Sequence, residues 1–407
     1  MARTRALFLA TAILHSLLPA LTTAGLVVQD EENHNISHLK NTGRQVSKAL
    51  FEELEELAKI VDIAYCVGNW GITEPFSCPG LCEQFPDFEL VKTWNTGPLL
   101  SDSCGYIALS HPPSPKKRVI VSFRGTYSIV NVIADLSVAP QVYIPYPNGT
   151  DPSKAKCDDC MAHGGFIRSW ENTRPEIIPE LLEIIEKYPD YQLVVTGHSL
   201  GGAVAALGSL EFKLRGWNPH VTTFGEPRIG NQALADYFDK TFGLNSTAPV
   251  AGDTESDLHL PYRRITHTKD PVPLLPPPSL DYRMHSGEIF ITKVDVPPSV
   301  TDLRVCYGPA DPTCISQQEE AYVRKLQNAL PLPLDLLDGD QNPIGSDDLD
   351  SEVEAQAIKP WELFFAHRDY FHRVGICFPN LFGSPDDSEK KSPWWKFKWL
   401  LPGHDNA

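Results

Sequence analysis

The sequence is poor in basic residues: 35 lysines and arginines stand against 52 aspartates and glutamates, and the formal net charge is −17 over 407 residues. A protein that binds nucleic acid presents a basic surface to the phosphates, so this class of function is excluded. After the N-terminal segment the sequence also lacks any apolar run of membrane-spanning length. What remains is a globular composition, 42 % hydrophobic and 21 % charged, with enough length for one large domain or two small ones.

Residues 1–24 have the pattern of a secretory signal peptide. Arg3 and Arg5 form the basic start, residues 6–21 form a short apolar run, and small residues follow at the expected cleavage site. The run is shorter than a typical membrane anchor, which is the alternative, so we expect a secreted, extracellular protein. A polar segment, 25–45, comes next. Three Asn-x-Ser/Thr sequences fit glycosylation on the secretory path, and they begin at Asn35, Asn148 and Asn245.

The nine cysteines indicate an oxidising compartment. Three pairs are close in sequence, two cysteines lie near the ends of the expected domain, and Cys104 is the candidate for the one left unpaired. The spacing of Cys157 and Cys160 also occurs in metal and redox motifs. Neither a second pair at zinc spacing nor a thioredoxin-like context accompanies it, so we expect no metal and no cofactor. The close pairs are Cys78/Cys82, Cys157/Cys160 and Cys306/Cys314, and the distant cysteines are Cys66 and Cys377.

Helical periods alternate along the chain with short runs of β-branched residues. This alternation predicts an α/β fold, with a central, mostly parallel sheet flanked by helices, in a domain over 46–377. The helices are expected at 46–65, 166–188 and 200–215, and the strands at 117–123, 192–196, 221–224, 262–265 and 288–291.

Residues 295–360 differ from the rest of the domain because they are rich in proline, aspartate and glutamate. We expect an acidic surface insertion there. The run 338–342 resembles the start of a calcium-binding loop, which is the alternative. Pro343 occupies the position that requires glycine, and Leu349 stands where the loop needs glutamate, so a solvated acidic loop is favoured. The chain ends in a tail, 378–407.

The pentapeptide Gly197-His198-Ser199-Leu200-Gly201 stands between a short strand pattern and an alanine-rich helical pattern. A Gly-x-Ser-x-Gly sequence in a strand–turn–helix context is typical of a nucleophile elbow. The sharp turn strains the serine backbone, the flanking glycines leave room for it, and the hydroxyl stands at the N-terminal end of the helix. We therefore predict that Ser199 is a nucleophile.

A serine nucleophile needs a base and a carboxylate that orients the base, and in a chain of this kind their order is serine, carboxylate, histidine. Asp270 is the candidate carboxylate, because it follows the strand pattern at 262–265 and precedes Pro271 and Pro273. The pattern alone does not choose among the histidines that follow, although the one in the polar tail is the least suited. These histidines are His285, His367, His372 and His404.

Five ordered motifs resemble the secreted fungal class 3 lipase family, which also contains feruloyl esterases. The resemblance spans about 46–377, apart from the acidic insertion, and it implies an α/β-hydrolase fold with a helical lid. His285 corresponds to a histidine of the family that is not the base. The matching motifs are residues 122–126, 197–203, 224–231, 264–273 and 366–371.

The resemblance also implies the roles of individual residues. In this family the catalytic histidine lies in an Ala-His-x-x-Tyr-Phe context shortly before the last cysteine, which implies His367 as the base for Ser199 and Asp270 as its orienting carboxylate. The backbone N–H groups of Thr126 and Leu200, with the Thr126 hydroxyl, would form the oxyanion hole. The implied disulfides are Cys66–Cys377, Cys78–Cys82 and Cys157–Cys160, with Cys306–Cys314 from the members that resemble feruloyl esterases.

Two kinds of ester substrate remain open. In this family a lid follows the oxyanion segment, and residues 128–136 are rich in apolar side chains that would adhere to a lipid–water interface. A plain core helix is the alternative for this stretch. Glu226 and the Cys306/Cys314 pair resemble feruloyl esterases instead. The expected lid residues are Ile129, Val130, Val132, Ile133 and Leu136.

The tail adds one further observation. Three tryptophans and three lysines within 391–399 would suit a lipid headgroup region, and a tail packed on the domain is the alternative. We weight the lid most, because it would meet the substrate. The sequence thus predicts a triacylglycerol lipase at a lipid–water interface, with feruloyl esterase as the alternative and with no nucleic acid or protein partner implied.

Overall fold

The computed structural model describes residues 45–68, 70–97, 102–126, 139–146, 156–244, 260–322, 365–375 and 377. Several of the sequence predictions lie outside these ranges. They are the signal peptide, the glycosylation sequences, the five lid residues, the calcium-like run with most of the acidic insertion, and the C-terminal tail.

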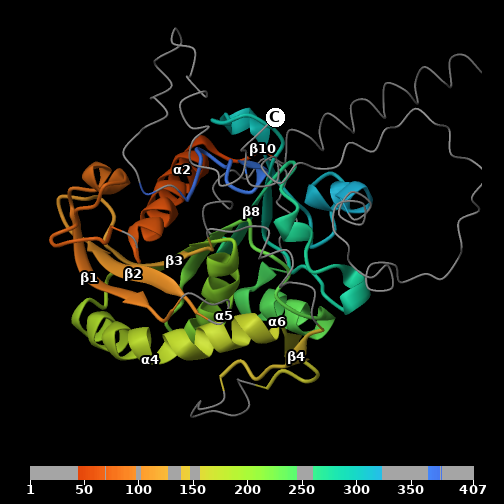
Figure 1. The fold of residues 1–407 in the computed structure, drawn as a ribbon, viewed down its shortest axis with the longest axis horizontal. Helices are drawn as coiled ribbons and strands as arrows, with labels where there is room; N and C mark the ends of the chain where they lie inside the picture. The colour runs from red at the N-terminus through yellow and green to blue at the C-terminus, as the bar shows by residue number, and fades with distance from the viewer. Residues whose placement is uncertain are drawn as a thin grey trace, which may run out of the picture.

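An eight-stranded sheet forms the centre of the domain, in the order β1-β2-β3-β6-β7-β8-β9-β10 (Figure 1). Strands β3, β6, β7, β8 and β9 run parallel to one another, and β1, β2 and β10 add antiparallel pairings at the two ends of the sheet. The strands are β1 (Phe88–Asn95), β2 (Cys104–Ser110), β3 (Arg118–Arg124), β6 (Gln192–His198), β7 (His220–Phe224), β8 (Tyr262–His267), β9 (Glu288–Ile291) and β10 (Leu303–Val305).

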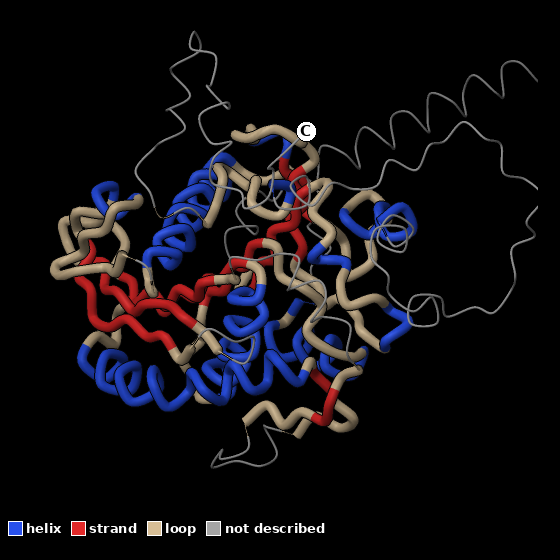
Figure 2. The backbone as a smooth tube through the Cα atoms, viewed as in Figure 1, coloured by secondary structure: helices blue, strands red, loops and turns tan. Residues whose placement is uncertain are grey.

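Helices cover both faces of this sheet, as Figure 2 shows. Helix α2 (Lys48–Ile63) packs on one face, where it contacts β3, β6 and β7. Helices α4 (Gly164–Lys187), α5 (Leu200–Leu214) and α6 (Gln232–Phe242) pack on the other. The result is the three-layered α/β architecture that the alternating sequence pattern predicts, and it fits the α/β-hydrolase fold that the resemblance implies.

The alternation of side chains along β3 explains why both faces are covered. Val119, Val121 and Phe123 belong to the core beneath α4 and α5, whereas Ile120 between them belongs to the core beneath α2. Successive residues of a strand point to opposite faces, so a strand with apolar residues in succession, as at 119–121, needs a helix layer on each side.

Local signals set the limits of the helices. The Ser47 side chain accepts a hydrogen bond from the N–H of Leu50 at the start of α2, and Asn231 does the same for Leu234 at the start of α6. Gly243 ends α6 in the left-handed conformation. The short elements are β4 (Gln141–Val142), β5 (Met161–Ala162), η1 (Ala64–Cys66), η2 (Leu81–Gln84), η5 (Val272–Leu274), η6 (Pro278–Leu280), η7 (Val300–Asp302) and η8 (Ile315–Gln318).

Strand β10 lies inside the stretch that we expected to be a surface insertion. It pairs with β9, and its residues Leu303 and Val305 are buried. Ile315, further along, is also fully buried. The expected boundary near 295 is therefore too early, because the chain up to at least 322 contributes to the sheet and to the core.

Eight of the nine cysteines form disulfides in the structure, and Cys104 is buried and free. The bond between Cys66 and Cys377 spans 311 residues and joins η1 to the end of the described chain. Among the described residues, no helix is long and apolar enough to cross a membrane. The disulfides are Cys66–Cys377, Cys78–Cys82, Cys157–Cys160 and Cys306–Cys314.

Candidate active site

Ser199 occupies the turn between β6 and α5. Its φ of 60° and ψ of −130° are strained for a residue with a side chain. A methyl group on Gly197 would lie 2.3 Å from the oxygen of Gly201, and one on Gly201 would lie 2.5 Å from the oxygen of Arg124. The turn therefore requires glycine at both positions, which explains the pentapeptide in steric terms.

Asp270 and His367 form a buried pair. Nδ1 of His367 lies 3.0 Å from each carboxylate oxygen of Asp270, and the hydroxyl of Tyr370 donates to Oδ2 of Asp270 at 2.5 Å. The N–H of Val272 donates to Oδ1 at 2.9 Å. Burial and the Asp270 charge raise the pKa of Tyr370 well above its usual value, so this hydroxyl keeps its proton as a donor.

This arrangement fixes which nitrogen of His367 can act as a base. Because Nδ1 faces a carboxylate, it carries the hydrogen, and Nε2 is left with a free lone pair. Nε2 of His367 and Oγ of Ser199 are both buried, and neither has a hydrogen-bond partner among the described residues. A buried acceptor and a buried donor that have no other partners suit a pair that transfers a proton once the substrate is bound.

Gly225, just after β7, connects the serine to the Asp–His pair. The preceding residue, Phe224, accepts a hydrogen bond from the N–H of Ser199 at 2.9 Å. A methyl group on Gly225 would lie 2.9 Å from Cε1 of His367 and 3.0 Å from Oδ2 of Asp270. The structure therefore brings the three predicted residues together around the C-terminal ends of β6, β7 and β8, where open α/β sheets bind their ligands.

The two predicted oxyanion residues flank Ser199. Leu200 begins α5 directly after it. Gly125 passes so close that an added methyl group would lie 2.9 Å from Cβ of Ser199, and Thr126 is the next residue. The hydroxyl oxygen of Thr126 is buried and has no hydrogen-bond partner among the described residues. A polar atom left unpaired beside the nucleophile suits a hole that is filled only by substrate.

The other histidines lie elsewhere. His285 is buried against Phe238, with Nδ1 2.8 Å from the oxygen of Ser286 and Nε2 3.0 Å from the Glu226 carboxylate. His372 keeps 28 % of its side chain exposed and lies 3.9 Å from Asp62. His404 lies outside the described residues.

Glu226 belongs to the same buried network as His285. Its other carboxylate oxygen accepts hydrogen bonds from Thr223 and Tyr262 at 2.6 and 2.7 Å, and the residue is 2 % exposed. Burial opposes its ionisation, but the charge and hydrogen bond of His285 hold the pKa of Glu226 below its usual value. Because Glu226 is buried and each of its oxygens accepts a hydrogen bond within the fold, it is not exposed to a substrate.

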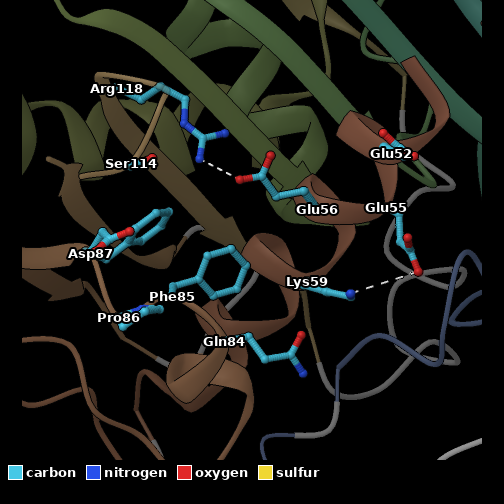
Figure 3. A pocket seen from close by; sticks show the side chains of 11 residues that line it. Glu52, Glu55, Glu56, Lys59, Gln84, Phe85, Pro86, Asp87, Ser114 and Arg118 are labelled. Carbon is cyan, nitrogen blue, oxygen red and sulfur yellow. Dashed lines mark hydrogen bonds and ion pairs between the residues drawn. The ribbon is translucent and has the colours of Figure 1, made fainter. Parts of the chain in front are cut away.

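One depression of ≈ 280 Å³ lies away from these residues, between α2, η2 and the starts of β1 and β3 (Figure 3). Arg118 and Glu56 point toward each other in its wall, 2.6 Å apart. Burial opposes ionisation of Glu56, but Arg118 and Lys116 hold its pKa below the usual value. These paired charges fasten α2 to the sheet, and none of the candidate catalytic residues lines the depression.

Sequence reasoning gave no role to Tyr370 or to Gly225. Both belong to matching motifs. Asp270, however, lies 100 residues from Tyr370, and a local sequence pattern cannot reveal a contact over that separation. The only available signal was position: Tyr370 follows His367 by three residues, close enough for both to reach one carboxylate.

Comparison with known proteins shows the family to which the chain belongs. Residues 120–280 match the family model described as Lipase (class 3). Lipase A of Sodiomyces alcalophilus is 45 % identical over 372 residues, which cover 86 % of this chain and 87 % of that protein. The chain belongs to the class 3 lipase family. This lipase is also 41 % identical to the secreted mono- and diacylglycerol lipase 2 of Gibberella zeae, over 90 % of this chain and 92 % of that protein.

A solved structure extends the comparison to three dimensions. The crystal structure of the Lip2 lipase from Yarrowia lipolytica superposes with a TM-score of 0.64 at 30 % identity, over 82 % of this chain and 97 % of that chain. The protein is therefore a lipase, an enzyme that hydrolyses carboxylic esters, on the α/β-hydrolase fold that the sequence predicts. The feruloyl esterase alternative is not favoured.

Proposed function

We propose that this lipase is secreted and hydrolyses acylglycerols at a lipid–water surface, with Ser199 as nucleophile, His367 as base and Asp270 as orienting carboxylate. One observation carries the assignment of residues. The Asp270 carboxylate holds Nδ1 of His367, while Nε2 of His367 and Oγ of Ser199 remain buried and without partners among the described residues. The elements that carry them meet at one edge of the sheet, and Gly225 touches the Asp–His pair beside the serine turn.

Acylation follows from these positions. Oγ of Ser199 attacks the ester carbonyl carbon as Nε2 of His367 takes its proton, and the carbonyl oxygen becomes an oxyanion. The backbone N–H groups of Thr126 and Leu200, with the Thr126 hydroxyl, donate hydrogen bonds to this oxyanion. The leaving alcohol then takes the proton from Nε2 of His367, and an acyl-Ser199 ester remains. Asp270 holds the ring and stabilises its positive charge while the proton resides there.

Deacylation repeats these steps with water. Nε2 of His367 removes a proton from a water molecule, which attacks the acyl carbon, and the oxyanion forms again at the same donors. Collapse of this second intermediate releases the fatty acid and returns the proton to Oγ of Ser199. No step needs a metal or an organic cofactor.

Three observations support the substrate and the location. The Gibberella zeae relative carries the name of a secreted mono- and diacylglycerol lipase, which supports acylglycerols as the substrate class. Glu226 is buried and both of its oxygens accept hydrogen bonds within the fold, so it offers no exposed polar contact to a hydroxycinnamoyl group. The four disulfides fit an oxidising, extracellular location.

The test compares Ser199→Ala with the parent on emulsified trioleoyl-, dioleoyl- and monooleoylglycerol, and on methyl ferulate. The parent should cleave the acylglycerols faster than the ferulate, and Ser199→Ala should lose about 10⁴–10⁶ in kcat on every substrate. Ser209→Ala removes another buried serine hydroxyl of the same region and is the matched control, with activity like the parent. Activity of Ser199→Ala above a tenth of the parent would refute the nucleophile. A preference of the parent for ferulate would refute the substrate class.

The interface has a separate test in the predicted lid. Val132→Asp combined with Ile133→Asp places two charges in the apolar stretch that should face lipid. We expect slower cleavage of emulsions and unchanged cleavage of dissolved short esters, because only the emulsion requires an apolar contact surface. An equal loss on both kinds of substrate would contradict a lid that acts at the interface.

A further inference from the structure

Asp270 sits on a turn whose backbone needs outside support. The turn follows β8, and Lys269 within it has a φ of 71°, in the left-handed region that is unfavourable for a residue with a side chain. The main chain anchors the turn at two points: Thr268 donates its N–H to the oxygen of Ile291, and Asp270 donates its N–H to the oxygen of His267. Neither bond involves the N–H of Lys269, the residue with the unfavourable φ.

Gln318, the last residue of η8, makes that contact. Its side-chain oxygen accepts a hydrogen bond from the N–H of Lys269 at 3.1 Å, and its side-chain nitrogen donates to Oγ1 of Thr268 at 2.9 Å. The whole amide of Gln318 is therefore engaged by the two residues that precede Asp270. The contact crosses about 50 residues of sequence.

Glu319, the next residue, holds the other side of the same turn through Arg228. Its carboxylate lies 2.7 Å from Nη2 of the buried Arg228. Nη1 of Arg228 donates to the oxygens of Leu274 and Pro276, at 2.7 and 3.0 Å, just after Asp270 along the chain. Two adjacent residues thus fasten the chain on both sides of Asp270.

The segment that carries Gln318 and Glu319 is itself fixed to the core of the protein. The Cys306–Cys314 disulfide ends one residue before η8, and Cys306 follows β10 directly. Ile315 is fully buried beside the disulfide, and its N–H donates to the carboxylate of Glu288 at 3.1 Å. The disulfide and this anchor fix where η8 ends, and therefore where the amide of Gln318 lies.

We propose that Gln318 is a positioning residue for the reaction: held by the Cys306–Cys314 disulfide and assisted by Glu319, it keeps the Asp270 carboxylate aimed at His367. This inference rests on the proposed catalytic roles of Asp270 and His367. Gln318 touches neither the substrate nor the reacting atoms. Its effect falls on kcat, because a displaced Asp270 stabilises the charged ring of His367 less in the transition state, while ground-state ester binding is unchanged.

The experiment measures kcat and KM on p-nitrophenyl butyrate for Gln318→Ala, Gln318→Glu and the neighbouring Gln317→Ala. We expect Gln318→Ala to lose about 10- to 100-fold in kcat, the scale of a small misplacement of a catalytic group, with KM within about twofold of the parent. Gln318→Glu should recover most of kcat, because a carboxylate also accepts from the N–H of Lys269 and from the hydroxyl of Thr268. Gln317, which is exposed beside it, is the matched control and should behave like the parent.

Several outcomes overturn the proposal. A purely structural contact would lower the unfolding temperature of Gln318→Ala and leave kcat at 25 °C unchanged, and a KM effect without a kcat effect would place Gln318 in substrate binding. If Gln318→Ala does not fold, Thr268→Val removes one of the two hydrogen bonds of Gln318, the one to Oγ1 of Thr268, and should lower kcat severalfold. Ser199→Ala separates the two hypotheses: if it is inactive while Gln318→Ala matches the parent, only the positioning role fails. If Ser199→Ala is active, the catalytic assignment fails first.

A double-mutant cycle tests the role of the disulfide. Removing the bond with Cys306→Ala and Cys314→Ala should lower kcat, and adding Gln318→Ala to that variant should lower it little further, because the two act through one geometry. Fully multiplicative losses in kcat would show that the disulfide and Gln318 act independently. They would overturn the proposal that the disulfide holds Gln318 in position.

Discussion

His198 donates a hydrogen bond from Nε2 to the main-chain oxygen of His367, over 2.8 Å. Because a carbonyl oxygen only accepts, Nε2 carries the hydrogen and Nδ1 is left to accept from the hydroxyl of Tyr65, 2.5 Å away. Burial, together with the nearby His367, lowers the pKa of His198 well below its usual value, so the ring stays neutral. His198, the residue before Ser199, thereby ties the serine turn to the backbone of His367.

Replacing Tyr65 with phenylalanine tests this tie. Tyr65→Phe leaves Nδ1 of the buried His198 without its donor, so we expect a loss of about 1–3 kcal/mol in the free energy of unfolding. We also expect a several-fold fall in kcat, because the backbone at His367 is less firmly held. Tyr191→Phe is the matched control, since it removes a tyrosine–histidine bond of 2.8 Å to His111 far from the serine. Equal effects of the two substitutions on kcat would contradict the tie.

Gly225→Ala tests the contact between β7 and the Asp–His pair. The new methyl group would lie 2.6 Å from the Tyr370 hydroxyl and 2.9 Å from Cε1 of His367, at a backbone φ of 59°. We expect a folded protein with a loss of kcat of about 100-fold, because His367 or Asp270 must move. Gly216→Ala is the control that separates the effect of backbone strain from that of a steric clash. Its φ is 87°, but nothing lies within 4 Å of the added methyl group. Its kcat, measured on the same dissolved ester, should equal that of the parent.

The sequence allowed the parallel part of the fold and the serine turn to be predicted because their signals are local. Strands β6 and β7 contain short runs of β-branched residues, and the pentapeptide is dictated by close backbone contacts within one turn. Strand β1 escaped prediction because a register shift between Leu90 and Lys92 breaks the alternation of its side chains. Strand β10 has only three residues, so it has no period to detect and exists through its pairing with β9.

The residues of the candidate site also differ in whether their signals are local in the sequence. Ser199 could be predicted from its own neighbours, and Asp270 from a strand that ends beside prolines. The choice of His367 depended on a family resemblance, because nothing local distinguishes it from His285. The structure gives the physical distinction: Nδ1 of each ring is occupied, but Nε2 of His285 is bound to Glu226, whereas Nε2 of His367 has no partner among the described residues.

This distinction yields a prediction for the two histidines. His367→Ala should be as inactive as Ser199→Ala, because the two residues act as one unit. His285→Ala should retain turnover but lose about 1–3 kcal/mol of stability, because it leaves one oxygen of the buried Glu226 carboxylate without its hydrogen-bond partner. Activity is measured below the unfolding temperature of each variant. An inactive but folded His285→Ala beside an active His367→Ala would show that the base is misassigned.

His372 predicts how stability depends on pH. Burial, with a contribution from Lys59, lowers its pKa from 6.5 to about 4. Above pH 6.5 the histidine is neutral in both states and has no effect. Between pH 6.5 and about 4 the unfolded chain takes up a proton that the folded one refuses, so stability falls as the pH falls. For a side chain that is 28 % exposed, we expect about 1–3 kcal/mol in total. Unfolding temperatures between pH 4 and 8 should fall less steeply for His372→Gln than for the parent, and equal slopes would contradict the assignment.

The Cys66–Cys377 bond should be the most stabilising of the disulfides. It closes a loop of 311 residues, and the chain-entropy relation gives about 6 kcal/mol for loops of this scale. Replacing both cysteines with serine should lower stability by a comparable amount, and should lower kcat because the bond anchors the segment that carries His367. The same change at Cys78 and Cys82, which closes a separation of 4 residues, should cost about 2 kcal/mol and spare kcat. The reverse order of losses in denaturant titrations would refute the entropic account.

The position of the base along the chain also has a consequence for biosynthesis. His367 comes 97 residues after Asp270, and its segment is fastened back to η1 by the last cysteine of the sequence. Ribosomes make the chain from its N-terminus, so the serine turn and the carboxylate exist before the base does. The disulfide that anchors the base forms only in an oxidising compartment. Under the roles that we propose, the proton acceptor is therefore assembled last, and a chain still being made carries Ser199 without a base to activate it toward the lipids of the cell that produces it.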